Sequence, residues 1–232
     1  ERAGLANYFL IVWDIVRFAR QQGIPCQGRG SAAGSLVVYV LFISPIDPLA
    51  HDLVFERFLS DERRAVPDID IDFDAGRREE VIQYIYERYG EAHTAMACTF
   101  VTFQRRSAVR DVGKALGLSP EVIESAAERG AALGTEDTAD TAARALLDEL
   151  AEQLHDFPRH LGIHSGGMIV TGAPLMGRVP TEPATMADRV VVQWDKDALE
   201  EIGLVKIDVI GLRLLSAVGG ATPLVAGTIG TP

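Results

Sequence analysis

The stretch AVPDIDIDFDAG, residues Ala65 to Gly76, sets aspartates at every second position with apolar residues between them. This alternation predicts a β-strand, because residues two apart in a strand point to the same face of the sheet. One face should carry carboxylates, and the other should join the core. The first set is Asp68, Asp70 and Asp72, and the second is Ile69, Ile71 and Phe73.

Carboxylates this close on one face repel one another unless water screens them, a proton is shared or a cation binds. Hard divalent cations with oxygen ligands, chiefly Mg²⁺ or Mn²⁺, suit such a face. An edge strand kept soluble by exposed acids is the alternative interpretation. A calcium EF-hand does not fit, because its loop needs glycine at the sixth position and glutamate at the twelfth. Counted from Asp68 the sixth residue is Phe73, and counted from Asp70 the two residues are Ala75 and Val81.

Another acid of interest lies far along the chain in GLVKIDVIGL, Gly203 to Leu212. The stretch predicts a buried strand in which Asp208 is the single acid, next but one to Lys206. A carboxylate is rarely buried without a partner. Asp208 therefore forms either a buried ion pair or a cluster with Asp70 and Asp72.

The sequence GRGSAAGS, Gly28 to Ser35, is a turn of small residues that opens an apolar helix. Its backbone N–H groups can meet a triphosphate through the turn and the helix N-terminus, although such turns more often serve packing alone. The spacing differs from the P-loop pattern G-x-x-x-x-G-K-[ST], which argues against a Walker nucleotidase. Combined with metals on carboxylates, the turn suits in-line phosphoryl or nucleotidyl transfer, in which one ion activates the attacking hydroxyl and the other stabilises the leaving pyrophosphate.

The composition indicates a globular protein, because 232 residues with 47% hydrophobic content can bury a substantial core. Two cysteines are too few for a disulfide framework and indicate a reducing compartment, so we expect a cytoplasmic location. The longest apolar run, Ser35 to Ile46, contains a proline and is too short to span a membrane. A net charge of -11 weighs against indiscriminate nucleic-acid binding. Basic residues gather around and after the aspartates, where they form either a local basic track or surface salt bridges.

The pattern along the chain predicts an α/β fold with a helical insertion. Helices are expected over residues 6–23 and 76–90, and strands over the aspartate stretch and residues 93–103, 166–172, 189–195 and 203–212. Between Gln104 and about Asp156 the pattern changes to short Ala- and Glu-rich helices. The tail after Ser216 is weakly structured by composition.

Several of these stretches, taken together, resemble the motifs of a known protein family. The run GRGSAAGSLVVYVLFISPIDPLAHDLVFERFLSDERRAVPDIDIDF resembles the palm signature of bacterial C-family DNA polymerases, the alpha subunit of DNA polymerase III. TFQRRSAVRDVGKALG, HSGGMIV and GLVKIDVIGLRLL continue it in the family's order, so the resemblance covers about Asn7 to Ser216. The run from Phe157 to Asp208 is more similar to the error-prone, damage-inducible branch than to the main replicase, so the resemblance implies a role in DNA replication or in error-prone translesion repair.

The resemblance implies a polymerase beta-like nucleotidyltransferase palm with a mixed sheet and an inserted helical thumb. The palm would comprise residues 1–103 and 158–216, the thumb residues 104–157, and residues 217–232 would be a poorly ordered tail. The implied catalytic and metal-binding residues are Asp70, Asp72 and Asp208, with Asp68 in a supporting role. The implied nucleotide-binding residues are Arg29, Gly30, Ser31, Arg57 and Lys206, and duplex DNA would be held by Arg105, Arg106 and Arg110. His160 and His164 are four apart, like a helical zinc pair, but are interpreted as structural or template-contacting.

The implied function is DNA-directed DNA polymerisation, in which two Mg²⁺ ions, with Mn²⁺ able to substitute, support transfer of a deoxynucleotide to a primer 3′ end. Asp208 would help to activate the primer hydroxyl. Primed DNA and dNTPs are the expected partners, with a sliding clamp and other polymerase subunits bound through other regions of the family's chain. The family's PHP domain, fingers, helix-hairpin-helix region and OB-fold do not fit in 232 residues, so the fragment is expected to polymerise poorly alone. Two alternatives stay open: a non-catalytic interaction module and a template-independent nucleotidyltransferase.

Overall fold

The chain forms two compact units in a computed structural model. Unit 1 comprises Glu1–Thr99 and Ile163–Pro232, and unit 2 comprises Phe100–Gly162. The structure describes all residues except 1–4, 31–33, 54–68, 130–137, 187 and 230–232. The chain passes from unit 1 to unit 2 within strand β3, Thr94–Thr102, and returns within strand β4, Pro158–Val170.

The central element is a mixed sheet of seven described strands in the order β1-β2-β7-β4-β3-β6-β5. The remaining bounds are β1 Cys26–Arg29, β2 Asp70–Asp74, β5 Thr181–Pro183, β6 Val190–Val192 and β7 Lys206–Leu212. Strand β2 is antiparallel to β1 and parallel to β7, and β7 is antiparallel to β4. Strand β6 is parallel to β3 and antiparallel to β5. The sheet confirms a mixed α/β architecture, in which β7 connects the aspartate strand to the rest of the sheet.

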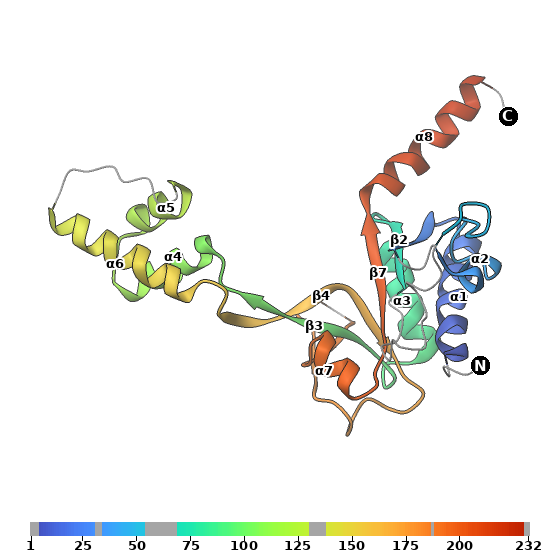
Figure 1. Ribbon diagram of the computed structural model, residues 1–232, viewed down its shortest axis with the longest axis horizontal. Coiled ribbons are helices and arrows are strands. Elements are labelled where there is room, and N and C mark those ends of the chain that lie inside the picture. Colours follow the sequence, from blue (N-terminus) through green and yellow to red (C-terminus); the bar gives the residue numbers. More distant parts are fainter. Residues whose placement is uncertain (1–4, 31–33, 54–68, 130–137, 187, 230–232) are drawn as a thin grey trace. The chain divides into compact units, whose positions relative to one another are not determined.

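The helices of unit 1 are α1 Ala6–Gln21, α2 Leu36–Val40, α3 Arg78–Tyr89, α7 Lys196–Glu201 and α8 Arg213–Ile229 (Figure 1). Helix α1 ends as the sequence predicts, because Gly23 takes the left-handed conformation with φ +65° that glycine accepts without strain. Helix α2 is capped by the Ser35 hydroxyl, which accepts a hydrogen bond from the Val38 N–H.

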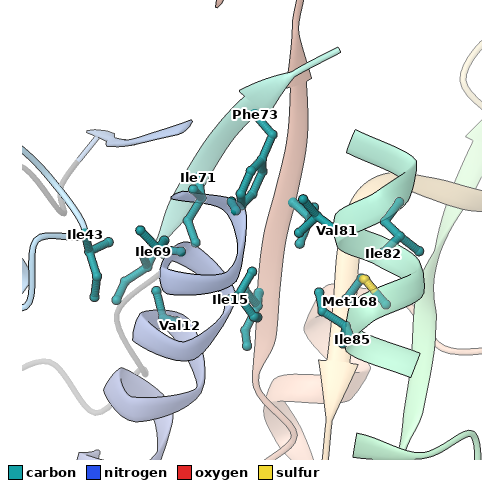
Figure 2. Packing of buried hydrophobic residues seen from close by; sticks show 14 of the residues in the cluster. Val12, Ile15, Ile43, Ile69, Ile71, Phe73, Val81, Ile82, Ile85 and Met168 are labelled. Atoms are coloured by element: carbon teal, nitrogen blue, oxygen red, sulfur yellow. The ribbon is translucent and has the colours of Figure 1, made fainter. Parts of the chain in front are cut away.

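The apolar face of β2 packs against helices α1 and α3, as Figure 2 shows. The predicted core residues of this strand, Ile69, Ile71 and Phe73, are all fully buried. They belong to one cluster with Val12 and Ile15 of α1 and with Val81, Ile82 and Ile85 of α3. The period-two interpretation is therefore confirmed for the part of β2 that the structure describes.

The opposite side of the sheet has its own smaller core. Ile169 of β4 packs there with Ala95 and Ala97 of β3 and with Leu199 of α7. Ile169 pairs in register with Lys206, so the Lys206 side chain belongs to this second face. Helices α1 and α3 thus cover the first face, and charged residues of β7 are on the second.

Unit 2 consists of helices α4 Arg105–Ala115, α5 Pro120–Arg129 and α6 Thr138–Leu154. Ala108, Val109, Leu147 and Ala151 form its core. Helices α4 and α5 approach closely at Gly113, where an added Cβ would lie 2.7 Å from a side-chain carbon of Ile123. Two backbone hydrogen bonds, Phe103 N–H to Phe157 O at 2.8 Å and Asp156 N–H to Phe103 O at 2.9 Å, close the base of the unit. The thumb identity of this helical unit stays a prediction.

The weakly structured tail expected after Ser216 differs from the structure, because helix α8 extends to Ile229. Gly219, Gly220 and Pro223 suggested disorder, but the helix starts directly after β7 and its first turn is held by a hydrogen bond to β2. The Ser216 hydroxyl donates to Asp74 Oδ1 at 2.5 Å, which joins its first turn to the end of β2. Within the described ranges, none of the helices combines the length and the hydropathy needed to span a membrane.

Candidate active site

The register of β2 and β7 brings the predicted aspartates to one face. Asp70 pairs directly with Asp208, and Asp72 pairs with Ile210. In-register residues on neighbouring parallel strands share a face and lie about 4.8 Å apart. Because Ile69, Ile71 and Phe73 point into the core, the three aspartates point away from α1 and α3, toward the second face.

Asp208 is a buried carboxylate whose two oxygens differ. Its side chain is 8% exposed, and its Oδ2 forms an ion pair with Lys206 Nζ, whose side chain is 6% exposed. Oδ1 is buried and has no hydrogen-bond partner among the residues that the structure describes. His164 Nδ1 lies 3.8 Å from Oδ1. The buried ion pair, one of the two alternatives left open by the sequence, is therefore present, and it satisfies one oxygen and leaves the other without a hydrogen bond within the described residues.

His164 was not among the predicted catalytic or nucleotide-binding residues, yet it lies beside Asp208. Its Nδ1 accepts hydrogen bonds from the Gly167 N–H at 2.7 Å and the Gly166 N–H at 3.2 Å. A ring nitrogen that accepts two N–H groups carries no proton, so the neutral ring holds its proton on Nε2. The signal in the sequence was the pair of glycines that follows the histidine in HSGG.

The structure does not support a helical zinc pair formed by His160 and His164. Both lie in strand β4 rather than in a helix, so a separation of four residues does not give them a shared helical face. His160 is exposed, and its Nδ1 lies 3.2 Å from the Leu161 carbonyl oxygen.

Two glycines of β4 allow the close approach of residues from β7. Gly167 pairs with Asp208 in register, and a Cβ added to it would lie 2.7 Å from Lys206 Cδ. A Cβ on Gly166 would lie 2.7 Å from the Val209 carbonyl oxygen. Real Cβ contacts are not this short. Glycine at 167 therefore lets the aliphatic stem of Lys206 lie flat across the neighbouring strand.

The predicted glycine turn meets the aspartates through strand β1. Arg29 pairs with Asp70 in register, and its Nε lies 3.2 Å from Asp72 Oδ1. Burial raises the pKa of Asp72, and the positive charge of Arg29 partly offsets this rise. Gly30 has φ +66°, and a Cβ added to it would lie 3.5 Å from Asp70 Oδ2. Of the other predicted residues, Ser31, Arg57 and Asp68 lie outside the described residues.

The fourth aspartate of the opening stretch, Asp74, has a different role. Its Oδ1 accepts hydrogen bonds from the Ser216 hydroxyl and from the Gly76 N–H at 2.8 Å. These two hydrogen bonds lower the pKa of Asp74. Asp74 therefore closes the turn after β2 and anchors α8.

The carboxylates of this face are of the chemical kind that a hard divalent cation prefers, but the described side chains do not form a ready-made metal site. Carboxylate oxygens are the ligands preferred by Mg²⁺ and Mn²⁺, and Asp208 Oδ1 is a buried oxygen with no partner in the described part of the chain. As the side chains stand, the described residues contain no group of three acidic, histidine or cysteine side chains that could hold a metal ion. Lys206 and Arg29 instead lie against two of the three carboxylates.

The arginines predicted to hold DNA form ion pairs within unit 2. Arg105 pairs with Asp148 at 2.8 Å, while Arg106 and Arg110 share Glu124 at 2.9 and 2.8 Å. All three are partly or well exposed, so these pairs contribute little to stability. Their role toward DNA stays a prediction.

Comparison with known proteins gives consistent matches. Residues 1–211 match the family model described as the bacterial DNA polymerase III alpha NTPase domain. The chain is 50% identical to an error-prone DNA polymerase of Anaeromyxobacter dehalogenans (strain 2CP-1) over 97% of its own length and 21% of that protein. It is 50% identical to the error-prone DNA polymerase of Corynebacterium jeikeium (94% and 18%) and 49% identical to that of Mycobacterium tuberculosis (strain H37Rv; 95% and 20%). The chain thus spans about a fifth of the length of these curated relatives.

Proposed function

The chain belongs to the bacterial DNA polymerase III alpha family, on its error-prone branch, and from this premise we propose that its acidic face is the catalytic centre of a DNA-directed DNA polymerase. The reaction would transfer a deoxynucleotide to a primer 3′ end during replication or error-prone repair. The observation that carries this proposal is the register of β2 and β7, which sets Asp70 beside Asp208 although the two are far apart in sequence.

Asp70 and Asp72 from β2 and Asp208 from β7 would hold two Mg²⁺ ions, with Mn²⁺ able to substitute. When bound, the ions supply activation of the primer hydroxyl and neutralisation of charge on the leaving pyrophosphate. The buried Oδ1 of Asp208 is the oxygen best prepared for this role, because it is already desolvated and has no partner in the described chain. Within this proposal, Asp208 also orients the primer hydroxyl for attack.

The triphosphate would lie against the turn after β1. Gly30 supports this position, because its backbone has the left-handed conformation with φ +66° and approaches the Asp70 carboxylate. Arg29 and Lys206 would supply positive charge to the triphosphate, together with Ser31 and Arg57 from outside the described residues. The fold is proposed to be a polymerase beta-like nucleotidyltransferase palm, supported by the mixed sheet with its D-x-D strand beside a strand with one aspartate.

Primed DNA would run along unit 2, the proposed thumb, where Arg105, Arg106 and Arg110 would exchange their carboxylate partners for backbone phosphates. A sliding clamp and further polymerase subunits would bind through regions of the longer relatives that this chain does not span. A cytoplasmic location belongs to the same proposal.

Calorimetric titration with Mn²⁺ and Mg²⁺, with and without a non-hydrolysable dNTP, tests the site. The wild-type chain should bind, and Asp70→Ala and Asp208→Ala should each weaken binding at least about 100-fold. Asp74→Asn is the matched control, because Asp74 lies on the same strand but is held by the turn and by Ser216. Failure of the folded wild-type chain to bind either ion would contradict the proposal and favour a non-catalytic interaction module.

Template dependence separates polymerisation from other nucleotidyl transfer. Full-length polymerase that carries this segment should extend a primer only on a template, and Asp70→Ala or Asp208→Ala should abolish extension. Incorporation at the same rate without a template would instead support a template-independent nucleotidyltransferase.

A further inference from the structure

We infer that Lys206 is a built-in counterion of Asp208 that a divalent cation displaces when it binds the acidic face. This inference rests on the proposed function and deepens it, because it assigns a role to Lys206 in the cation-free state. Lys206 is then a positioning residue that neutralises the charge of Asp208 in the cation-free state. Once a cation is bound, the lysine side chain is free to move toward the triphosphate.

Burial distinguishes Lys206 from Arg29, the basic side chain that pairs with Asp72 on the same face. Lys206 and Asp208 have side chains 6% and 8% exposed, whereas the Arg29 side chain is 50% exposed. Arg29 can therefore turn into solvent at little cost. Lys206 is confined, and a buried ammonium needs a carboxylate close by.

A divalent metal ion and the ammonium group of Lys206 repel each other if both lie against Asp208. A divalent ion held by Asp208 would lie close to the ammonium of Lys206, because Lys206 contacts the same carboxylate. Like charges that lie close together repel strongly where water is excluded. Binding of a divalent ion therefore favours the state in which Lys206 has left Asp208.

The two oxygens of Asp208 offer a route for the exchange. Oδ2 holds Lys206, while Oδ1 is buried and has no hydrogen-bond partner among the described residues. His164 does not fill this place, because its Nδ1 lies 3.8 Å away and already accepts the N–H groups of Gly166 and Gly167. Oδ1 would therefore be the oxygen that can receive a cation, and Lys206 would leave Oδ2.

Gly167 provides a way to displace Lys206 without removing its charge. A Cβ at this position would lie 2.7 Å from Lys206 Cδ and 2.9 Å from His164 Nδ1, so Gly167→Ala pushes both the lysine stem and the ring of His164 out of their places. This variant keeps every charge of the face. It should raise Mn²⁺ affinity about threefold or more by weakening the competing ion pair.

Chemical labelling tests the displacement directly in the 232-residue chain. Brief acetylation with acetic anhydride, read by peptide mass spectrometry, should modify Lys206 slowly without cation and at least about fivefold faster with saturating Mn²⁺. Lys196 is the matched control, because its side chain is 48% exposed and pairs with Glu200 on α7. Its labelling should not respond to Mn²⁺. Lys206 that stays equally protected at saturating Mn²⁺ would overturn the inference.

Thermal unfolding gives a second readout. Lys206→Met leaves Asp208 buried beside Asp70 without its counterion and should lower the unfolding midpoint by about 10 °C in the absence of cations. Saturating Mn²⁺ should remove most of this difference, because the wild-type chain loses the same ion pair on binding. Lys196→Met should shift the midpoint little under either condition. An equal loss with and without Mn²⁺ would show that the pair is structural only.

The outcomes separate this inference from the proposed function. If Mn²⁺ binds neither the wild-type chain nor Lys206→Met, the metal site itself fails, and the counterion role fails with it. If Mn²⁺ binds the wild-type chain and Asp208→Ala abolishes binding while Lys206 labelling is unchanged, the metal site stands and only the displacement of Lys206 is wrong.

Discussion

Two aspartates with the same burial have opposite surroundings. Asp14 on α1 and Asp208 on β7 are each 6% exposed. Both oxygens of Asp14 are used, since Oδ1 accepts from Arg17 at 2.7 Å, and Oδ2 accepts from the hydroxyls of Tyr84 at 2.8 Å and Tyr89 at 3.0 Å. Asp208 has its ion pair on one oxygen and no hydrogen bond on the other within the described chain.

The comparison shows that burial alone does not mark a functional acid. Burial raises the pKa of Asp14, but the hydrogen bonds from Tyr84 and Tyr89 and the charges of Arg17 and Arg88 outweigh it, and the net pKa is lowered. The hydrogen-bonding capacity of this carboxylate is used on both oxygens, and its bonds to Tyr84 and Tyr89 join α1 to α3. An acid with unused hydrogen-bonding capacity has room for a ligand.

Among the replacements compared here, that of Asp14, whose two oxygens are both hydrogen-bonded, should have the largest effect on stability. Asp14→Ala removes the shared acceptor of two tyrosines and two arginines and should lower the free energy of unfolding by about 3 kcal/mol. Urea denaturation measures this change, and Mn²⁺ affinity should stay at the wild-type value. A loss of Mn²⁺ binding in the folded variant would break the distinction between the two aspartates.

Acid should remove the contribution of the Asp14 charge to stability. Its pKa is lowered in the folded state, so the ionised form stabilises the fold at pH values above the unfolded value of 3.8. That stability is lost as the pH falls below 3.8 through the folded pKa. Wild type should therefore be more stable than Asp14→Asn at neutral pH, and the difference should shrink below pH 4 in denaturation curves. A difference that is constant down to pH 2.5 would contradict the role assigned to its charge.

Replacement of Asp208 should cost less stability than replacement of Asp14. Asp208→Ala leaves Lys206 beside Asp70, which can accept its charge, and relieves repulsion among the carboxylates of the face. With Asp70 as the new partner of Lys206, the net change is the loss of one hydrogen bond, and we expect a loss of about 1 kcal/mol in urea denaturation, together with loss of Mn²⁺ binding. A loss larger than that of Asp14→Ala would make Asp208 the main structural acid and reverse the comparison.

The smallest effect on the fold belongs to the exposed charges of unit 2. Glu124→Gln releases Arg106 and Arg110 from their shared carboxylate and should leave the unfolding midpoint essentially unchanged. If these arginines contact DNA, the freed charges should raise affinity for primed duplex about threefold at low salt, and less at higher salt. Fluorescence anisotropy over a salt series measures this change. Unchanged DNA affinity at low salt would argue against a duplex-binding role for the two arginines.

Local pattern predicted a large part of the fold. The alternation of Ile69, Ile71 and Phe73 with aspartates predicted both faces of β2. The single acid within an apolar run predicted that Asp208 is buried, and left open whether it pairs with Lys206 or joins the other aspartates. The helix that ends before Gly23 and the strand that became β3 also follow from hydrophobic periodicity. These features depend on neighbours in sequence, which a linear pattern records.

The features that the sequence did not predict depend on contacts between distant segments. The approach of His164 to Asp208 results from the register of β4 against β7, and the anchoring of α8 results from the hydrogen bond of Ser216 with Asp74. The short strand β5 contains a proline and lies at the sheet edge, where little hydrophobic signal is needed. Pairing of α4 arginines with Glu124 likewise needs the packing of α4 on α5.

The position of β7 in the sheet determines the order in which the molecule can assemble during synthesis. Strand β7 lies between β2 and β4, so without it the sheet consists of two separate pieces, β1-β2 and β4-β3-β6-β5. A growing chain that has not yet reached Lys206 has an unpaired edge on each piece, and unpaired edges promote aggregation. Closure of the long loop between β2 and β7 is entropically costly and slow. Truncation before β7 should therefore yield an aggregation-prone product rather than a smaller domain, and the acidic face comes together only when the last strand is in place.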